Sequence, residues 1–244
     1  MNNELVLKES YPISYSQMDC NLALKPFVLM NFLQDIASKS AENLGFGYSY
    51  ISQNNLAWFL IKYWMEFDDY PVNCDELTIA TEPRGYNKLF AYRSFNLSNN
   101  EKLLGKIFSI WSVINLETRA LTLVQNAINN PNMPQYSKRE DDLQFSKIKP
   151  VENPTHTREF RVRYNDLDVN MHANNGNYIV WAFEALPFEF RQKHKIKTLD
   201  FMFKKEAKYD EEIISEVEIL NNLTIHKIKN KENEDLCLIQ CEWK

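Results

Sequence analysis

Glycine is scarce in this chain of 244 residues, which contains five glycines. Loops that cradle phosphate groups depend on glycines at fixed spacings, and the chain has neither a GxGxxG nor a P-loop pattern. The longest apolar stretch, residues 56–67, is interrupted by Lys62 and is shorter than the roughly 20 residues that a membrane span needs. We therefore expect neither a glycine-rich nucleotide site nor a membrane-spanning helix.

Paired cysteines are also lacking. The four cysteines form no CxxC motif and have no histidines at metal-binding spacing: Cys20, Cys74, Cys237 and Cys241. This usage is typical of free thiols in a reducing compartment rather than of disulfides or a zinc site. The first residues show no basic start followed by an apolar run, so no secretory signal is predicted. We therefore expect a cytoplasmic protein without a bound metal or cofactor.

An excess of charge of one sign is missing as well. With a formal charge of −5, the chain gives no reason to expect binding to nucleic acid. Its 44% hydrophobic and 25% charged residues are typical of a folded globular protein. One local basic run stands out, and it includes Arg191, Lys193, Lys195 and Lys197. Such a run is either a solvated surface or a docking patch for an acidic partner.

An internal repeat organises the chain. Residues 15–23 align with residues 164–172 at an offset of 149, with Tyr, Asp and Asn in identical places. Apolar periodicity predicts a helix after each copy, at 26–44 and at 174–194, and Pro187 should end or kink the second helix near Leu186. Runs of aromatic and β-branched residues then predict four strands after each helix. After the first helix they are 58–67, 76–81, 89–97 and 104–114, and after the second they are 198–209, 213–220, 223–229 and 236–243.

The same order of elements thus occurs twice, in a first unit (1–124) and a second unit (158–244), with a proline- and asparagine-rich linker at 125–157. An apolar helix face must be buried, so one helix followed by consecutive antiparallel strands predicts an α+β unit whose sheet wraps around a long central helix. Two such units would pack together as a pseudo-dimer within one chain. A doubly wound fold would alternate strands and helices, which this chain does not do.

The second copy of the repeat carries polar residues at alternate positions: Asp168, Asn170 and His172. In an extended segment these side chains would share one face, bringing a carboxylate, an amide and an imidazole together. Backbone N–H groups at the following helix start would stabilise an oxyanion, and we expect them near Asn174, Asn175 and Gly176. Because the first copy has Ala23 in place of the histidine, only the second copy is suited to acyl transfer.

A family resemblance follows from these residues. The sequence DLDVNMHANN at 166–175, with Tyr178, Trp181 and Glu184, resembles the signature of the plant and bacterial acyl-acyl-carrier-protein (acyl-ACP) thioesterases. The likeness covers nearly the whole chain and in the first unit includes Tyr15, Asp19, Gln34 and Trp111. It implies two tandem hotdog units, which agrees with the repeat. It also implies hydrolysis of fatty acyl-ACP to a free fatty acid and ACP, ending fatty acid synthesis. The partner would then be ACP with its phosphopantetheine-linked acyl chain.

By position, the resemblance implies that Asp168, Asn170 and His172 belong to the active site and adds Glu206, which follows two lysines. Ala207 stands where the family often has cysteine, so we expect chemistry by carboxylate and water, with Glu206 or His172 as the base. Regular pleating of strand 198–209 would turn Glu206 away from the helix. Either a β-bulge intervenes, or Glu206 meets the site across the sheet between the units.

An acyl chain offers only methylene groups for recognition, so an apolar slot should select the substrate. We expect the aromatic residues of the first unit to form its wall, namely Phe27, Phe32, Trp58 and Phe59. The basic run 191–197 would dock the acidic carrier protein. Three other interpretations stay open: an acyl-CoA thioesterase of the same fold, a non-catalytic acyl-binding module and a dehydratase. A homodimer also stays open.

Overall fold

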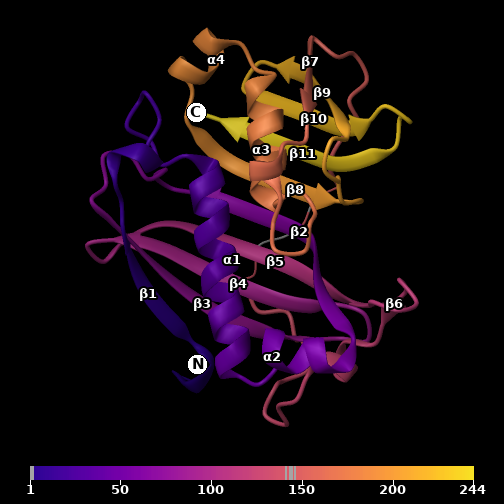
Figure 1. Cartoon of the computed structure of the whole chain (residues 1–244). Coiled ribbons are helices and arrows are strands. Elements are labelled where there is room, and N and C mark those ends of the chain that lie inside the picture. Colours follow the sequence, from indigo (N-terminus) through magenta and orange to yellow (C-terminus); the bar gives the residue numbers. More distant parts are fainter. Residues whose placement is uncertain (1–2, 141, 143–144, 146) are drawn as a thin grey trace.

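The structure, a computed structural model, describes all residues except 1–2, 141, 143–144 and 146. Its main feature is an antiparallel sheet of eleven strands, and the two main helices lie on the same face of this sheet (Figure 1). This agrees with the sheet wrapped around central helices that the repeat predicts, and with the tandem hotdog units that the family resemblance implies. Among the described residues, no helix combines the length and the apolar composition needed to cross a bilayer.

The first half of the chain supplies one long helix and the strands on one side of the sheet. In chain order the elements are β1 (Leu7–Pro12), α1 (Pro26–Asn43), α2 (Tyr48–Ile51), β2 (Leu56–Phe67), β3 (Glu76–Tyr86), β4 (Ala91–Asn99), β5 (Lys102–Asn115) and β6 (Leu121–Thr122). Helix α1 begins at Pro26, whose fixed φ suits a first helical turn. It buries positions three and four residues apart, such as Leu29, Leu33 and Ile36, against the sheet.

The second half repeats this plan. Its elements are β7 (His156–Arg161), α3 (Asn175–Glu184), α4 (Phe188–Lys193), β8 (Ile196–Phe203), β9 (Glu212–Leu220), β10 (Leu223–Asn230) and β11 (Asp235–Trp243). The strand order is β1-β3-β4-β5-β2 in the first half and continues as β8-β11-β10-β9-β7. The second series is the first in reverse, so the halves are related by an approximate two-fold axis. The predicted pseudo-dimer within one chain is confirmed.

The two halves meet along two contacts. Strands β2 and β8 pair antiparallel, with Tyr63 opposite Phe201, and thereby join the two sheets into one. The N-terminal ends of α1 and α3 also meet, because a Cβ atom placed on Gly176 would lie 2.8 Å from Cδ2 of Phe27. Buried residues of both halves form one continuous hydrophobic cluster. The site described below therefore lies on a rigid frame.

Some predicted elements differ from the structure. The helix break at Pro187 is confirmed, because α3 ends at Glu184 and α4 begins at Phe188. The predicted strand 198–209 is too long, since β8 ends at Phe203. Strands β1 and β7 were not predicted, and β7 begins inside the segment expected to be a linker. The limits of the units and the linker stay a prediction.

Candidate active site

The loop before α3 is a tight turn built by Asp168. Its Oδ1 accepts the backbone N–H groups of Asn170 at 2.8 Å and His172 at 3.2 Å. The N–H of Asp168 donates to the His172 carbonyl at 2.7 Å, and Met171 takes a φ of +65°. The expected extended segment with a shared face is therefore wrong. An aspartate that binds N–H groups two and four residues ahead folds the chain back on itself.

The first copy of the repeat forms the same turn. Oδ1 of Asp19 accepts the N–H groups of Asn21 at 2.9 Å and Ala23 at 3.0 Å, and Leu22 takes a φ of +57°. Because the copy without an imidazole keeps this geometry, the common role of the two aspartates is to shape the loop. Asp168 acts on the site by holding the backbone of His172.

The turn places His172 against the segment that follows β8. Nδ1 of His172 lies 3.3 Å from Oε2 of Glu206, which is ion-pair distance, although the two groups are not aligned as a hydrogen bond. The histidine side chain is 16% exposed, whereas the glutamate side chain is 45% exposed. The structure thus brings an imidazole and a carboxylate together, with the carboxylate open to water.

An irregularity after β8 turns Glu206 toward this histidine. The N–H groups of Lys204 and Lys205 both donate to the Leu236 carbonyl, at 2.9 and 3.2 Å, as two residues opposite one do in a β-bulge. The N–H of Ala207 then donates to the hydroxyl of Tyr178 at 2.8 Å. The regular pleat stops at Phe203, so the alternation expected for 198–209 does not apply to Glu206.

The N-terminal end of α3 is partly occupied by its own hydrogen bonds. The N–H of Asn174 donates to the Asp166 carbonyl at 2.8 Å, and the N–H of Gly176 donates to Oδ1 of Asn174 at 2.8 Å. Of the three expected oxyanion donors, only the N–H of Asn175 has no partner within the described part of the chain. Asn170 is exposed on the turn, and its side chain makes no hydrogen bond with the described residues.

Two residues on α1 were missed as candidates. A cavity of about 450 Å³ beside the first turn is lined by Asp19, Asn21, Val180 and Phe183. By the offset of 149, Asp19 and Asn21 correspond to Asp168 and Asn170 of the second turn. Val180 and Phe183 of α3 correspond in the same way to Asn31 and Gln34 of α1. Oε1 of Gln34 accepts a hydrogen bond from Nδ2 of Asn175 at 3.3 Å, and the buried Oδ1 of Asn31 has no partner among the described residues. Extending the alignment of the repeat into the two helices would have found Asn31 and Gln34, because these polar residues stand where α3 has apolar ones.

The cysteines do not offer a nucleophile at this site. Cys20 is exposed beside the first turn, and the other three are buried. Burial raises the pKa of the Cys237 and Cys241 thiols well above the usual value, which keeps them protonated. Ala207, at the position expected from the family to hold cysteine, is fully buried. Within the described residues, no group of three or more His, Cys, Asp or Glu side chains could hold a metal ion.

Two family models match the chain, the acyl-ACP thioesterase N-terminal domain over residues 4–131 and the acyl-ACP thioesterase C-terminal domain over residues 149–244. The chain belongs to the acyl-ACP thioesterase family.

Named relatives agree with this family. An oleoyl-acyl carrier protein thioesterase, chloroplastic, of Coriandrum sativum is 25% identical over 86% of this chain and 62% of its own length. A palmitoyl-acyl carrier protein thioesterase, chloroplastic, of Gossypium hirsutum is 26% identical over 94% of this chain and 57% of its own. The chain thus spans about three fifths of the length of these relatives.

Solved structures of acyl-ACP thioesterases share the fold. The enzyme from Bacteroides thetaiotaomicron aligns with a TM-score of 0.88 at 23% identity, covering 99% of this chain and 98% of that one. The 12:0-ACP thioesterase from Umbellularia californica aligns with a TM-score of 0.84 at 18% identity, covering 98% of this chain and 97% of that one. This family member therefore shares its fold with these structures over nearly all of the given chain.

The four aromatic residues expected to line the acyl slot do not share one cavity in this acyl-ACP thioesterase family member. Phe27 lines the 450 Å³ cavity beside the first turn. Trp58 lines a different cavity, of about 90 Å³, between α1 and the sheet. Phe32 stacks on Tyr11 of β1, and neither it nor Phe59 lines these two cavities. Of the four, Trp58 is the one placed between the helix and the sheet next to open space.

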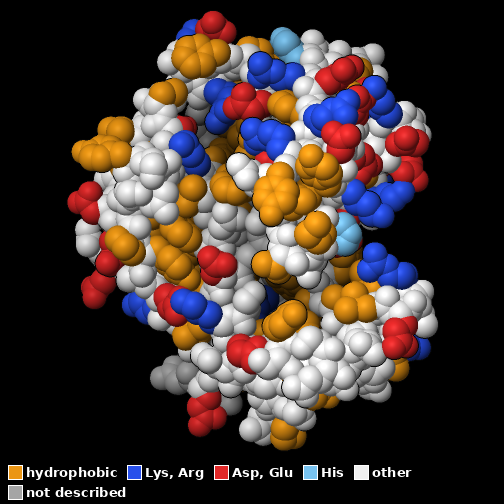
Figure 2. Space-filling model, viewed as in Figure 1, with side chains coloured by type: hydrophobic (Ala, Val, Ile, Leu, Met, Phe, Trp, Pro, Cys, Tyr) orange, Lys and Arg blue, Asp and Glu red, His pale blue; other side chains and the backbone are white. Residues whose placement is uncertain are grey.

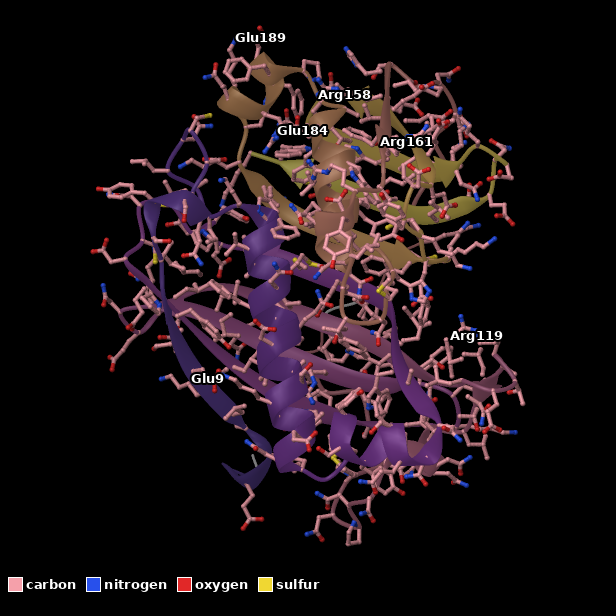
Figure 3. All side chains as sticks on the ribbon, in the orientation of Figure 1. Glu9, Arg119, Arg158, Arg161, Glu184 and Glu189 are labelled. Atoms are coloured by element: carbon pink, nitrogen blue, oxygen red, sulfur yellow. The ribbon has the colours of Figure 1, made fainter. Side chains whose placement is uncertain are left out.

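The basic run expected to dock the carrier lies beside the first turn. Arg191 pairs with Glu184 at 3.2 Å, and Lys197 pairs with Glu242 at 3.4 Å. Glu184 also pairs with Arg158 at 3.3 Å, and both are labelled on the second half in Figure 3. Lys193 and Lys195 line a hollow of about 230 Å³ together with Asp19 and Asn21 of the first turn. Figure 2 shows charges of both signs over the second half. Because Arg191 and Lys197 are paired with carboxylates, the run is not a surface of one sign.

Proposed function

We propose that this chain hydrolyses the thioester of fatty acyl-ACP, releasing a free fatty acid and ACP, at His172 and Glu206. The 3.3 Å approach of Nδ1 to the water-exposed carboxylate is the observation that carries the proposal. It occurs beside the copy of the repeat that has an imidazole, whereas the other copy has Ala23. Membership of the acyl-ACP thioesterase family supports the reaction class.

In the proposed reaction, the Glu206 carboxylate removes a proton from a water molecule as the water oxygen attacks the thioester carbonyl carbon. The resulting oxyanion accepts a hydrogen bond from the N–H of Asn175 at the positive end of α3. The carbon–sulfur bond then breaks, and the thiolate takes up the proton that Glu206 received. His172, beside Glu206, holds the carboxylate in place and donates a hydrogen bond to the reacting groups.

The other predicted residues have supporting roles in this proposal. Asp168 shapes the turn through its two backbone hydrogen bonds, so it is a positioning residue. The exposed amide of Asn170 positions the water or the substrate. Gln34 orients Asn175, whose N–H is the remaining oxyanion donor.

The first unit (1–124) would hold the acyl chain and the second unit (158–244) would carry out the chemistry. ACP with a phosphopantetheine-linked acyl chain is the proposed partner, which supplies both the substrate and the leaving thiol. The cytoplasmic location and a homodimer stay predictions, and the curated relatives are named as chloroplastic proteins.

Rates of hydrolysis of acyl-ACP and acyl-CoA with the same acyl chain test the proposal. Loss of general-base assistance costs about 10²–10⁴-fold, so Glu206→Gln should lower kcat strongly without abolishing folding. His172→Ala should also lower kcat, because the reacting groups lose the hydrogen bond that the imidazole donates. A matched pair, Asn170→Ala and Asn21→Ala, changes equivalent exposed residues on the two turns, and only the first should lower kcat. Wild-type rates in the Glu206 and His172 variants would refute the site. Faster hydrolysis of acyl-CoA than of acyl-ACP would favour the acyl-CoA thioesterase instead.

A further inference from the structure

A charged side chain lies inside the first half, between α1 and the sheet. Arg93 of β4 is 6% exposed, and its Nη1 donates to Oγ of Ser40 on α1 at 3.0 Å and to Oγ1 of Thr81 on β3 at 3.1 Å. Burial lowers the pKa of Arg93 to about 10. The guanidinium therefore keeps its positive charge at neutral pH.

Within the described residues, no carboxylate neutralises this charge. The neighbouring acidic residues on or near β3 are engaged elsewhere, Glu82 with Arg139 at 3.0 Å and Asp142 with Arg84 at 2.8 Å. The Nε and Nη2 atoms of Arg93 make no hydrogen bond with described residues. Neither atom is among the fully buried side-chain atoms without a partner in the described part of the chain, so both border accessible space, where a ligand can supply an acceptor. A charge held in a largely apolar region gains from such an acceptor.

Arg93 faces a cavity of about 90 Å³ whose walls are otherwise mainly apolar. Ala37 and Ala41 of α1 form one side, and Trp58 and Trp111 form part of the other. Such a space accepts a hydrocarbon chain. Among the described residues that line it, Arg93 is the one charged residue.

A second unmatched polar group lies next to this cavity. Tyr63 contacts Trp111 edge to face, with ring centroids 6.5 Å apart, and its buried hydroxyl has no hydrogen-bond partner in the described part of the chain. A guanidinium can only donate hydrogen bonds, whereas a phenol can donate one and can also accept. An acceptor oxygen is therefore the ligand group that both side chains can bind.

A row of paired residues crosses the sheet from the second unit to Arg93. Phe201 of β8 lies opposite Tyr63 of β2, Tyr63 opposite Ser109 of β5, and Ser109 opposite Arg93. Phe201 and Arg93 are therefore separated by three strand-to-strand spacings, or about 14 Å across the sheet. The cavity thus lies about three strand spacings from the junction with the second unit, on the face of the sheet that α1 covers.

We propose that this cavity receives the distal end of the acyl chain and that Arg93 selects a chain carrying an acceptor oxygen, as a hydroxyl or a carboxylate, over a plain hydrocarbon chain. The inference rests on the thioesterase function proposed above. A methyl end would displace water from Nε and Nη2 of Arg93 and give no hydrogen bond in return, whereas an oxygen at the chain end accepts from the guanidinium and from the Tyr63 hydroxyl. Arg93 is then a specificity-determining residue outside the catalytic turn.

Hydrolysis of three series of acyl-ACPs, with plain, ω-hydroxy and ω-carboxy chains from octanoyl to hexadecanoyl, tests this selection. At the chain length that reaches Arg93, an oxygenated chain should have a kcat/KM about 10- to 100-fold above the plain chain, as expected for a hydrogen bond to a charged group. Arg93→Met should abolish this ratio. Arg119→Met, a control at an exposed arginine on the turn before β6 (Figure 3), should leave it unchanged. A larger gain for the carboxylate than for the hydroxyl would identify an anion as the preferred group.

A binding experiment separates this inference from the proposed reaction. Pantetheine amides of the same chains cannot be hydrolysed, so calorimetry on wild type, Arg93→Met and Tyr63→Phe measures chain selection without chemistry. Oxygenated amides should bind more tightly than plain ones, with the preference lost in Arg93→Met and reduced in Tyr63→Phe. This result would support the cavity even if no thioester were hydrolysed. Tyr63→Phe removes a single hydroxyl and decides the question if Arg93→Met does not fold. Equal or weaker binding of oxygenated chains at every length would overturn the proposal.

Discussion

Asp19 and Asp168 make the same pair of backbone hydrogen bonds, but only one of their turns carries an imidazole. Replacing either residue with alanine should lower the free energy of unfolding by a similar amount, about 1–2 kcal/mol, because two N–H groups lose their acceptor. Only Asp168→Ala should also lower kcat on acyl-ACP, since its turn holds His172 against Glu206. Urea unfolding and steady-state kinetics measure the two effects separately.

A conservative change supplies the control at the same residue. Asp168→Asn keeps an Oδ1 acceptor and should retain most of the stability and most of the activity. If the two alanine variants had equal kcat, the turn would have no part in positioning the site.

At the scale of single residues, the structure brings two of the predicted groups together by a different geometry from the one expected, and their role in the site stays a prediction. The spacing of Asp168, Asn170 and His172 suggested a shared face, whereas the aspartate side chain folds the segment into a turn. The pairing of His172 with Glu206 joins residues 34 positions apart. It depends on the carbonyl of Leu236 and the hydroxyl of Tyr178, so spacing along the chain could not reveal it.

At the scale of elements, the junction of α1 and α3 sets a size limit at Gly176. A Cβ atom there would lie 2.8 Å from Cδ2 of Phe27 and 3.2 Å from Oδ1 of the capping Asn174. Gly176→Ala should therefore destabilise the fold by about 1–3 kcal/mol through overpacking. Adding Phe27→Ala removes the ring and should make the glycine change less costly. A double-mutant cycle by urea unfolding tests this coupling, and additive effects would show that the ring does not oppose the methyl group.

The elements with local signals were predicted well. Pro26 and an apolar stripe mark α1, and Pro187 marks the break after α3. Strands β1 and β7 read LKESYP and HTREFR, and both lie at edges of the sheet. β7 is almost fully exposed and β1 alternates between half-buried and exposed residues, so neither has the apolar run by which the other strands were predicted. The end of β8 at Phe203 has no local signal, because the break depends on how the next residues pair with β11.

At the scale of the whole molecule, the approximate two-fold axis creates two related turns, and the basic run lies beside the one without a histidine. If ACP docks there, Lys193→Glu with Lys195→Glu should raise KM several-fold with little change in kcat, because the charges assist binding and not chemistry. Both lysines are without a salt bridge among the described residues, so the change breaks no ion pair. Kinetics at two salt concentrations measure the effect. An unchanged KM would show that the run only solvates the surface, and docking would then be sought around His172.

Acid should destabilise the whole fold through one buried histidine. His226 of β10 is fully buried next to Phe183, with its Nε2 2.9 Å from Oγ1 of Thr224, and burial lowers its pKa to about 3 from an ordinary 6.5. The imidazole is therefore neutral in the folded protein, while in the unfolded chain it binds a proton below about pH 6.5. The stability that this neutral histidine contributes is complete above that pH and is lost as the pH falls toward 3. At pH 5 the part already lost is about 2 kcal/mol. Urea unfolding at pH 7 and pH 5 should show that His226→Gln loses about 2 kcal/mol less than wild type over this interval. An equal loss in the two proteins would assign the acid sensitivity to the carboxylates instead.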